Sequence, residues 1–464
     1  MSSKGYKNKV NGWIYLAIEG SPRARGFAHG YALAAEIKEI FRMLDYRLMN
    51  VYGYTRAFLA DVISAVYGSR IKENFPEFYH EMVGITKGVN KKGLPVVLAD
   101  ILLWNCYFSI ESVMIKLPEL VKADPELGLK YGHLFSQGHS THVAITGIAE
   151  HCTAFMAVGS ATRDGKIVCG HNTFSDYIDG QWGKVLLDIR PTTGNRIFMQ
   201  TAPGCIASGT DFYVTSAGLI CTETTIGGFN KFALGDPICC RIRQAMQYGS
   251  TLDECVAILR HNNGGDYACS WLLGDTRTNT ILRLELGLTY TSVVKKTDGY
   301  FVGYNSPEDH RIRNLECVPG GHYDIRTHQG ARRLRLMQLM DQYVGRIDVQ
   351  IGKKILADHY DVYLKQENPC SRTCCGHYET DDRAFISGVG LPLPFQPRGT
   401  LDGIVCDTTM AEGMGFLARW GSSCGQPFDA PAYVKENAQW AEQEPYLKSR
   451  PTQPWTAFSV LTKN

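Results

Sequence analysis

The sequence lacks the segments that direct a chain into or across a membrane. Its first ten residues are polar and have no apolar centre of the kind that a signal peptide needs. The most apolar early run, residues 101–110, is too short to cross a bilayer and contains Asn105. No Asn-x-Ser/Thr glycosylation acceptor occurs anywhere. These absences favour a cytoplasmic location over a lysosomal or secreted one, and they predict no integral membrane segment.

A large excess of one charge is also lacking. The 464 residues hold 48 basic and 46 acidic side chains, so nothing indicates binding to nucleic acid. The fifteen cysteines show no regular disulfide-scaffold spacing, and their odd number leaves at least one unpaired, which favours a reducing compartment. With 44% hydrophobic and 20% charged residues, the chain has the balance of a globular protein with a sizeable core.

Several familiar catalytic motifs are missing. There is no Walker loop, no G-x-G-x-x-G and no H-E-x-x-H. Residues 421–425 match the pattern G-x-S-x-G, but a nucleophile elbow needs a helix directly after it. Pro427 and Pro431 disfavour such a helix, so we reject a serine hydrolase of this type.

One short polar loop holds Cys370, Cys374, Cys375 and His377, which are soft ligands of the kind that zinc prefers. No second Cys/His pair at a familiar spacing completes the set. A packed or disulfide-bonded loop is therefore the favoured interpretation, with structural zinc as the alternative.

The period of the hydrophobic pattern changes near residues 142–152. Before this point, helical spacing predicts helices within residues 25–44, 56–67, 75–84 and 95–110. After it, alternating patterns predict paired strands interrupted by blocks of helix. Runs of strands and runs of helices indicate an α+β fold, in which largely antiparallel sheets are layered against helices.

Cys152 begins the first strand after this change. A polar turn follows, and a second strand leads into residues 170–173, which read Gly-His-Asn-Thr. A cut between His151 and Cys152 would place a thiol and an α-amine on one residue, with His171 and Asn172 delivered by the hairpin partner. The alternative is an ordinary buried cysteine that opens an ordinary hairpin.

These motifs, taken in order, resemble the phospholipase B-like proteins and their relatives among the cysteine-type N-terminal nucleophile (Ntn) hydrolases. The Gly-His-Asn-Thr motif stands at the matching place after the cysteine. Asn305-Ser306-Pro307 resembles a motif of the choloylglycine hydrolases, and residues 25–30 resemble the pro-region of the isopenicillin N acyltransferases. Further matches lie at residues 218–225, 399–402, 414–418, 421 and 426–428.

The resemblance implies a four-layer αββα sandwich and a proenzyme that cuts itself before Cys152. Residues 1–151 would form a mainly helical pro-segment and residues 152–464 the catalytic domain, and the two fragments would stay associated. Cys152 would be the nucleophile, with its freed α-amine as the base. The matched positions further imply that Asn305 donates to the oxyanion and that Arg332 favours the thiolate. His171 and Asn172 would be polar partners on the neighbouring strand.

The implied reaction is cleavage of an acyl bond, an amide or a lipid ester, through a thioester on Cys152. It requires an acylated small molecule or lipid as substrate and no metal or organic cofactor. An N-acyltransferase or an N-acyl amide hydrolase of the same fold is an alternative, because water and a second substrate can both take the thioester.

The sequence departs from the family pattern in places. Phe174 stands where the acyltransferase and bile-salt branches have Asp, and residues 267–271 lack the Asn-rich character of phospholipase B-like members. The second departure favours a further alternative, a non-catalytic protein that retains the fold and binds lipid or a partner.

Overall fold

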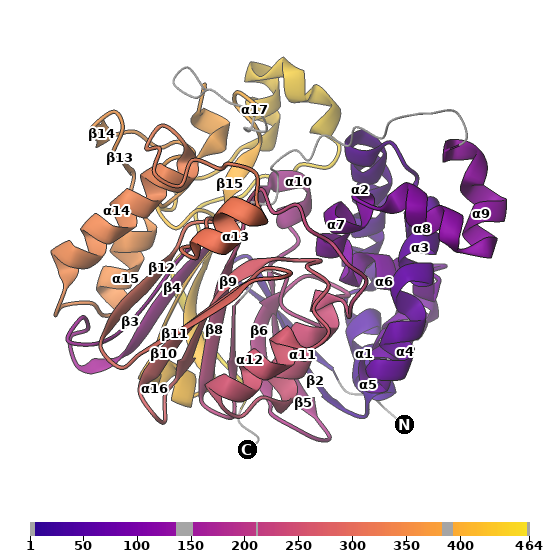
Figure 1. Cartoon of the computed structure of the whole chain (residues 1–464), viewed down its shortest axis with the longest axis horizontal. Helices are drawn as coiled ribbons and strands as arrows, with labels where there is room; N and C mark the ends of the chain where they lie inside the picture. The colour runs from indigo at the N-terminus through magenta and orange to yellow at the C-terminus, as the bar shows by residue number, and fades with distance from the viewer. Residues whose placement is uncertain (1–4, 136–151, 210–211, 383–392, 462–464) are drawn as a thin grey trace.

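The computed structural model describes residues 5–135, 152–209, 212–382 and 393–461. Two large β-sheets face each other in this part of the chain (Figure 1). The larger sheet has nine strands in the order β1 (Tyr6–Val10), β2 (Trp13–Gly20), β5 (Val185–Pro191), β6 (Ile197–Thr201), β7 (Phe212–Thr215), β8 (Leu219–Thr225), β9 (Cys269–Asp275), β10 (Thr280–Leu286) and β11 (Thr291–Lys296).

The second sheet has seven strands and contains Cys152. Its order is β12 (Gly299–Gly303), β3 (Cys152–Gly159), β4 (Gly165–Asp176), β16 (Asp402–Asp407), β17 (Gly415–Trp420) and β18 (Thr456–Ser459), and β15 (Arg398–Thr400) pairs with the far end of β4. A separate small hairpin joins β13 (Tyr360–Asp361) to β14 (Gln366–Glu367). Among these described strands, every pair is antiparallel apart from β2 with β5.

The inner faces of the two sheets share one hydrophobic core. Alternate residues of β3, such as Ala154 and Met156, point into it and meet residues such as Phe198 and Leu272 of the larger sheet. The intervening residues of β3 point the other way, and Phe155 packs against the helices on the outside. Successive side chains of a strand point to opposite faces, and both faces of β3 are buried, so its residues are hydrophobic on both sides.

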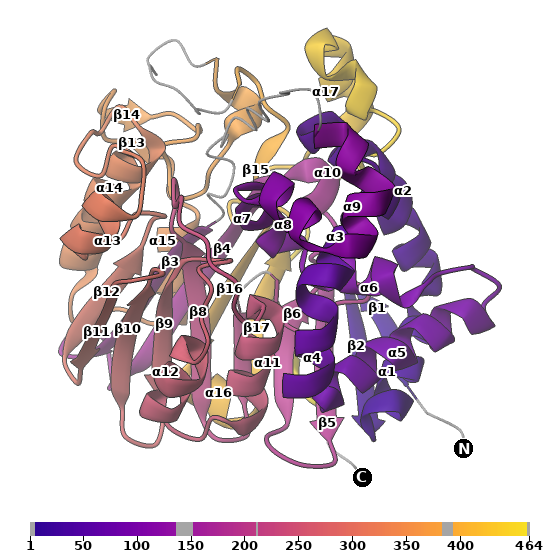
Figure 2. The same cartoon turned by 45° about the vertical axis from the view of Figure 1, so that its right-hand side comes forward.

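Helices cover both outer faces. The N-terminal helices lie on the outer face of the nine-stranded sheet together with α11 (Ile238–Tyr248) and α12 (Leu252–Arg260), which stand in front of the strands in Figure 2. The seven-stranded sheet is covered by α14 (His328–Tyr343) and α15 (Val349–Leu356). The layers are therefore helix, sheet, sheet, helix, which confirms the predicted αββα sandwich.

The N-terminal helices form a compact group at one side of the molecule, drawn in indigo and purple in Figure 1. They are α1 (Pro22–Ala32), α2 (Ala34–Tyr52), α3 (Arg56–Ile63), α4 (Ser69–Asn74), α5 (Pro76–Lys91), α6 (Leu98–Asn105), α7 (Ile110–Met114), α8 (Leu117–Ala123) and α9 (Pro125–Tyr131). The remaining short helices are α10 (Tyr177–Gly180), α13 (His310–Leu315), α16 (Thr408–Glu412) and α17 (Ala430–Glu436).

Helices α1 and α5 pack with their backbones in contact. A Cβ at Gly26 would lie 2.0 Å from the carbonyl oxygen of Glu81, and one at Gly84 would lie 2.5 Å from that of Arg23. Only glycine permits this approach. It brings Arg25 of α1 within 2.5 Å of the Glu81 carboxylate, and Arg243 of α11 approaches the same carboxylate at 3.0 Å.

The N-terminal segment is also part of the larger sheet, because β2 pairs in parallel with β5 over seven residues. The hydrophobic pattern of residues 1–20 did not lead us to predict these strands. The division at residue 151/152 stays a prediction, since residues 136–151 lie outside the described part of the chain.

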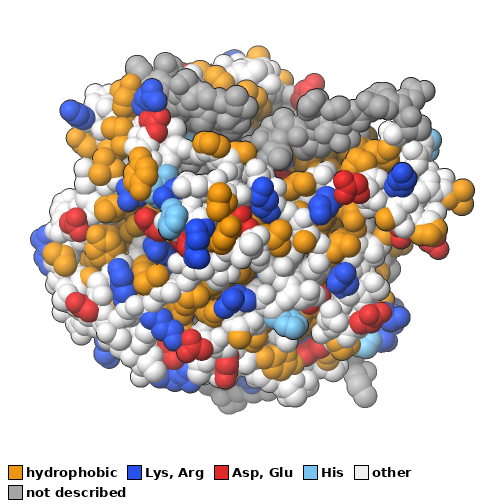
Figure 3. All heavy atoms as spheres, viewed as in Figure 1, with side chains coloured by type: hydrophobic (Ala, Val, Ile, Leu, Met, Phe, Trp, Pro, Cys, Tyr) orange, Lys and Arg blue, Asp and Glu red, His pale blue; other side chains and the backbone are white. Residues whose placement is uncertain are grey.

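No helix among the described residues is both long and apolar enough to span a membrane. Figure 3 shows basic and acidic side chains interspersed on the viewed face, with hydrophobic side chains between them. That face has no extended region of a single charge, as the near-zero net charge of +2 predicts.

Candidate active site

Cys152 is the first residue of β3 and is fully buried. It lies opposite Thr173 of β4, and Ala154 lies opposite His171. Since Ala154 faces the core between the sheets, strand alternation places the side chains of Cys152 and Thr173 on that same inner face. The predicted nucleophile therefore stands at the end of the sandwich, where the inner core begins.

Both backbone polar groups of Cys152 are held by predicted site residues. Its N–H donates to Oδ1 of Asn305 at 3.3 Å, and its carbonyl oxygen accepts from a terminal nitrogen of Arg332 at 2.5 Å. The other terminal nitrogen of Arg332 donates to the same Asn305 Oδ1 at 2.8 Å. The structure therefore brings Cys152, Asn305 and Arg332 into one hydrogen-bonded group.

The backbone around Asn305 fixes the direction of its side chain. Asn305 has φ +67°, a left-handed conformation that asparagine tolerates better than most residues. Its carbonyl oxygen accepts from the backbone of Gly227 and from the side chain of Gln329. Its Nδ2 donates to the Thr225 carbonyl at 2.8 Å, so the amide is held between β8 and Arg332. Oδ1 accepts from the backbone N–H of Cys152, whereas the expected role of Asn305 was to donate to an oxyanion.

His171 lies on the inner face of β4, one step deeper in the core than Thr173. Burial lowers its pKa to about 3, against an opposing contribution from the backbone of Glu223 on β8. The imidazole is therefore neutral at any physiological pH. Its surroundings are those of a packed core histidine, and the geometry gives it no direct contact with Cys152 among the described contacts.

Asn172 points to the opposite face of the sheet from Cys152. Its Nδ2 donates to the carbonyl oxygens of Leu356 and Cys374 at 2.8 and 2.9 Å. Its Oδ1 accepts a short hydrogen bond from Ser423 Oγ. Asn172 thus joins three segments of the outer layer to β4, and the structure does not bring it to the thiol.

Asp402 is a buried acidic residue at the end of the matched 399–402 motif, and the sequence alone did not indicate a role for it. It accepts from the Thr173 N–H at 3.3 Å and from Gln200 of the larger sheet at 2.7 Å. Burial raises its pKa to about 7, and the hydrogen bonds from Gln200 and Thr173 oppose the shift. An acid that titrates near neutrality and bonds to the residue opposite Cys152 is a candidate member of the site.

A pocket opens beside the same end of β4. Its walls include Thr173 and Phe174 of β4, Ala202 after β6, and aromatic side chains at the end of α6 and beyond it, namely Trp104, Tyr107 and Phe108. Thr173, which lines the apolar pocket, lies opposite Cys152 on the neighbouring strand. Such a pocket suits the hydrocarbon part of an acyl group.

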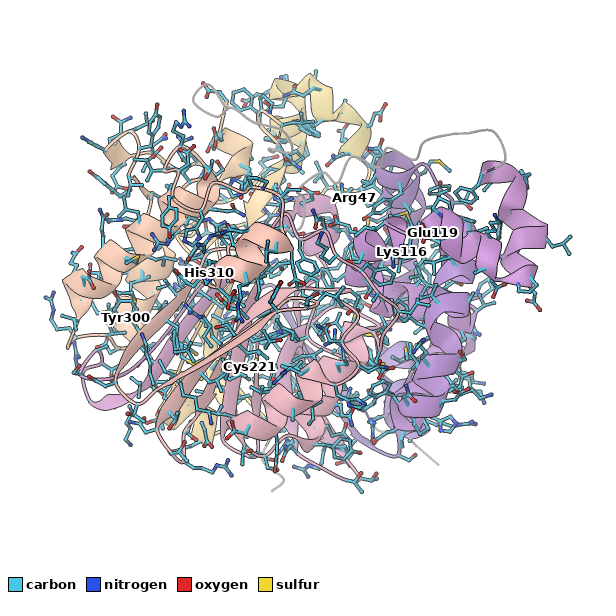
Figure 4. The ribbon with its side chains drawn as sticks, viewed as in Figure 1. Arg47, Lys116, Glu119, Cys221, Tyr300 and His310 are labelled. Atoms are coloured by element: carbon cyan, nitrogen blue, oxygen red, sulfur yellow. The ribbon has the colours of Figure 1, made fainter. Side chains whose placement is uncertain are left out.

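Asp179, which lines the pocket, belongs to a charged group that also includes Arg47 and Asp176. Arg47 of α2 forms a short ion pair with Asp176 and lies 3.7 Å from Asp179, and Figure 4 labels it where the N-terminal helices meet α10. Asp179 also accepts from the hydroxyl of Tyr107 at 2.9 Å. These contacts tie the helical segment to the strand that carries Thr173.

Comparison of the sequence with models of protein families shows the family to which the chain belongs. The family model described as Phospholipase B matches residues 72–445, which includes every candidate site residue named above apart from Arg47. The chain belongs to the phospholipase B family.

Curated relatives agree with this family. Phospholipase B-like 1 of Homo sapiens is 25% identical over 259 residues, covering 48% of this chain and 45% of the human protein. Phospholipase B of Crotalus adamanteus is 28% identical over 294 residues, covering 56% of this chain and 50% of the snake protein. An uncharacterized protein of Archaeoglobus fulgidus is 23% identical over 263 residues, with 55% and 40% covered. The chain spans about half the length of the curated relatives it matches.

Among solved structures, a mutant of the conjugated bile acid hydrolase from Clostridium perfringens matches with 11% sequence identity. The match covers 58% of this chain and 89% of that chain, with a TM-score of 0.33. The assignment of the αββα fold rests on the sheet order and the layers described above.

This phospholipase B family chain also contains a group of potential metal ligands. Single atoms of His359, Cys375, His377 and Cys424 all lie within 4.8 Å of one another. All fifteen cysteines fall within the described residues and none forms a disulfide. Two of the four loop residues singled out from the sequence, Cys375 and His377, belong to this group, whereas the other two partners come from more distant parts of the chain.

The G-x-S-x-G match at residues 421–425 does not form a nucleophile elbow. It follows β17, and the next helix, α17, begins only at Ala430. Ser423 is buried and donates to Asn172. This outcome agrees with the rejection made from the two prolines.

Proposed function

We propose that this protein is a self-processing hydrolase of the cysteine Ntn type that cleaves an acyl bond, with Cys152 as its nucleophile. The observation that carries the proposal is the group around Cys152, in which Asn305 holds its nitrogen and Arg332 holds its carbonyl oxygen. A cysteine that only packs at the start of a strand does not require a buried arginine and an asparagine of left-handed backbone conformation to bind its backbone. Membership of the phospholipase B family supports the same conclusion.

In the proposed self-cleavage, the Cys152 thiol attacks the carbonyl carbon of the preceding residue and its proton passes to the departing nitrogen. The peptide becomes a thioester, and the nitrogen of Cys152 becomes a free α-amine. Water then cleaves the thioester and releases a carboxyl group and the thiol. His151, on the other side of the cut bond, lies outside the described residues.

The freed amine would act as the base in turnover. An unperturbed α-amine has a pKa of about 7.7–8.0, so it can exchange a proton with the thiol near neutral pH. Asn305 Oδ1 already faces this nitrogen and would orient it. The positive charge of Arg332 beside the same residue disfavours a protonated amine and stabilises a thiolate.

The substrate would be an acylated lipid or amide whose hydrocarbon part enters the pocket beside Thr173. The thiol would take the acyl group as a thioester and release the alcohol or amine. Water would then release the carboxylic acid and restore the thiol. Transfer of the acyl group to a second amine is the alternative outcome of the same intermediate.

The two fragments would stay together after the cut, because contacts between them are extensive. Strand β2 of the first fragment pairs with β5 of the second. The carboxylate of Glu81, from the first fragment, lies against Arg243 of the second at 3.0 Å. Asn105 adds two hydrogen bonds, to Gly204 and from Ile206.

The proposal is tested first by the intact mass of the purified protein. We expect two fragments with a break before Cys152, and a single full-length chain for Cys152→Ala. Cys169→Ala is the matched control, because Cys169 is an equally buried cysteine on the partner strand and should leave the break unchanged. A wild-type chain that remains uncut and does not react with thiol-directed acyl probes would indicate instead a non-catalytic binding protein.

The substrate class is tested with the cleaved protein. Radiolabelled phospholipids and N-acyl amides are offered separately, and mass spectrometry after acid quenching locates the acyl group on the N-terminal Cys152. Release of free fatty acid from phospholipid supports lipid hydrolysis. Release from amides alone, or transfer to an added amine, supports the amide hydrolase or acyltransferase alternative.

A further inference from the structure

We propose that His359, Cys375, His377 and Cys424 bind a structural zinc ion. The four residues come from three separate segments: the residues just before β13, the loop before residue 378, and the turn after β17. Two thiols and two imidazoles are a ligand set that zinc prefers in proteins.

Two nitrogen–sulfur distances fit a tetrahedral ion. With Zn–S near 2.3 Å and Zn–N near 2.0–2.1 Å, two such ligands at a tetrahedral angle lie about 3.5 Å apart. His377 Nε2 lies 3.4 Å from Cys375 Sγ and 3.5 Å from Cys424 Sγ. The ring of His359 has its centroid 5.0 Å from that of His377 and supplies the fourth ligand atom within 4.8 Å.

A carboxylate supports one of the ligands from behind. Nδ1 of His377 lies 2.9 Å from Oε1 of Glu379, which leaves Nε2 to face the two sulfur atoms. Histidines that bind metal generally use their second nitrogen in this way, and the carboxylate fixes the ring and increases its basicity. Its presence distinguishes the group from a chance meeting of two thiols and two rings.

The ion would be structural. Four protein ligands complete a tetrahedron and leave no position for a substrate or water. Cys375 and His377 are buried, whereas His359 and Cys424 are partly exposed, so the ion would lie near the protein surface with two of its ligands buried. Cys370 and Cys374 of the same loop contact other groups: Cys370 Sγ lies 3.6 Å from Asp361, and Cys374 packs in the outer core.

The zinc would link the loop that contains Cys375 to the turn that contains Cys424, next to β4, the strand that pairs with Cys152. Asn172 accepts from Ser423, beside Cys424, and donates to the carbonyl oxygen of Cys374, beside Cys375. The metal would thus hold together segments that Asn172 already joins, and Asn172 directly precedes the residue of β4 that pairs with Cys152.

The inference does not depend on self-cleavage, and its test is metal content. The full chain, without a histidine tag, is produced in medium of defined metal content and purified without chelators. We expect one zinc ion per chain in the wild type and in Cys152→Ala, and loss of the ion in Cys375→Ser and Cys424→Ser. Cys370→Ser is the matched control, because it alters a buried thiol of the same loop outside the group, and it should retain the ion.

A second measurement covers variants that fail to fold. Zinc in the wild type is exchanged for cobalt, and a tetrahedral site with two thiolates should show intense visible d–d bands and sulfur-to-cobalt charge transfer. A wild type that carries no zinc and gives no such spectrum overturns the proposal. So does a disulfide between Cys375 and Cys424 in the native protein, or equal loss of metal in Cys370→Ser.

Discussion

The guanidinium of Arg332 lies 2.8 Å from Oδ1 of Asn305, and the two side chains bind the carbonyl oxygen and the N–H of Cys152, respectively. Each residue thereby holds the other. Arg332 is fully buried, lies over the ring of Phe174 and is further fixed by the His328 carbonyl oxygen. Arg332 and Asn305 together fix the position of the backbone of Cys152, the first residue of β3.

This coupling predicts non-additive effects on self-cleavage. Arg332→Gln and Asn305→Ala should each slow cleavage by about 100-fold, the scale for losing one positioned polar group at a reacting centre. The double variant should be little slower than the slower single variant, because the first change already releases the partner. Pulse–chase in cell-free translation, read on denaturing gels, measures the rates.

The control for this set is Arg333→Gln, which alters the next arginine along α14. Arg333 is partly exposed and lies 3.5 Å from Glu308, away from Cys152. Its cleavage rate should equal that of the wild type. Strictly additive losses in the double variant would contradict a coupled pair.

The buried carboxylate of Glu81 predicts a strong effect on stability. Glu81 lies between Arg25 and Arg243, and all three side chains are fully buried. Glu81→Ala would leave two guanidinium groups without their shared partner and should lower the free energy of unfolding by about 3–5 kcal/mol. Glu77→Ala removes a partly exposed partner of Arg25 and should cost less. Urea unfolding of Cys152→Ala chains, which stay in one piece, measures both.

The same carboxylate predicts sensitivity to acid. Burial alone would raise the pKa of Glu81, but the charges of Arg243 and Arg25 hold it below its ordinary value. The unfolded chain therefore takes up a proton at a higher pH than the folded chain, and stability falls as the pH drops through the unfolded and then the folded pKa. In Cys152→Ala chains the urea midpoint should fall as the pH drops through this acidic range, and this part of the fall should be absent when Glu81→Gln is added.

Asp402 predicts the opposite dependence on pH. Burial raises its folded pKa to about 7, whereas an unfolded aspartate has a pKa of about 3.9. Between these values the folded chain keeps a proton that the unfolded chain has lost, so the contribution of Asp402 to stability declines as the pH rises from about 4 to 7. The urea midpoint of Asp402→Asn should decline less over this range than that of the wild type. Parallel pH profiles would show that folding does not raise the pKa of Asp402.

Much of the fold follows from local patterns in the sequence. Helix α5 begins at Pro76 as predicted, and Thr251 caps α12 by accepting from the N–H of Glu254. Alternation after Cys152 predicted paired strands, and strands β5 to β11 of the larger sheet form in this part of the chain. The pairing of β2 with β5 was not predicted, because it joins segments that are far apart in the chain, such as Ile14 and Val185.

The site was predictable from separate matched positions and less so from the contiguous motif at residues 170–173. Asn305 and Arg332 meet at Cys152 as matched positions suggested. Consecutive strand residues point to opposite faces, so the adjacent His171 and Asn172 could never both face the thiol, and the strand period alone could have revealed this. The metal group was missed because Cys424 lies 47 residues after His377, a separation that follows no known ligand spacing.

The pocket beside Thr173 predicts that substrate binding and self-cleavage can be separated. Ala202 lines this pocket, and Ala202→Phe would fill part of the space with a ring while leaving the contacts of Cys152 unchanged. We expect normal cleavage before Cys152, because that reaction uses the chain's own peptide, together with a loss of at least about tenfold in acyl hydrolysis. Completed self-cleavage also shows that the variant has folded. Ala202→Ser, which changes the volume little, should keep both activities. If Ala202→Phe hydrolyses its substrate at the wild-type rate, the acyl group binds elsewhere.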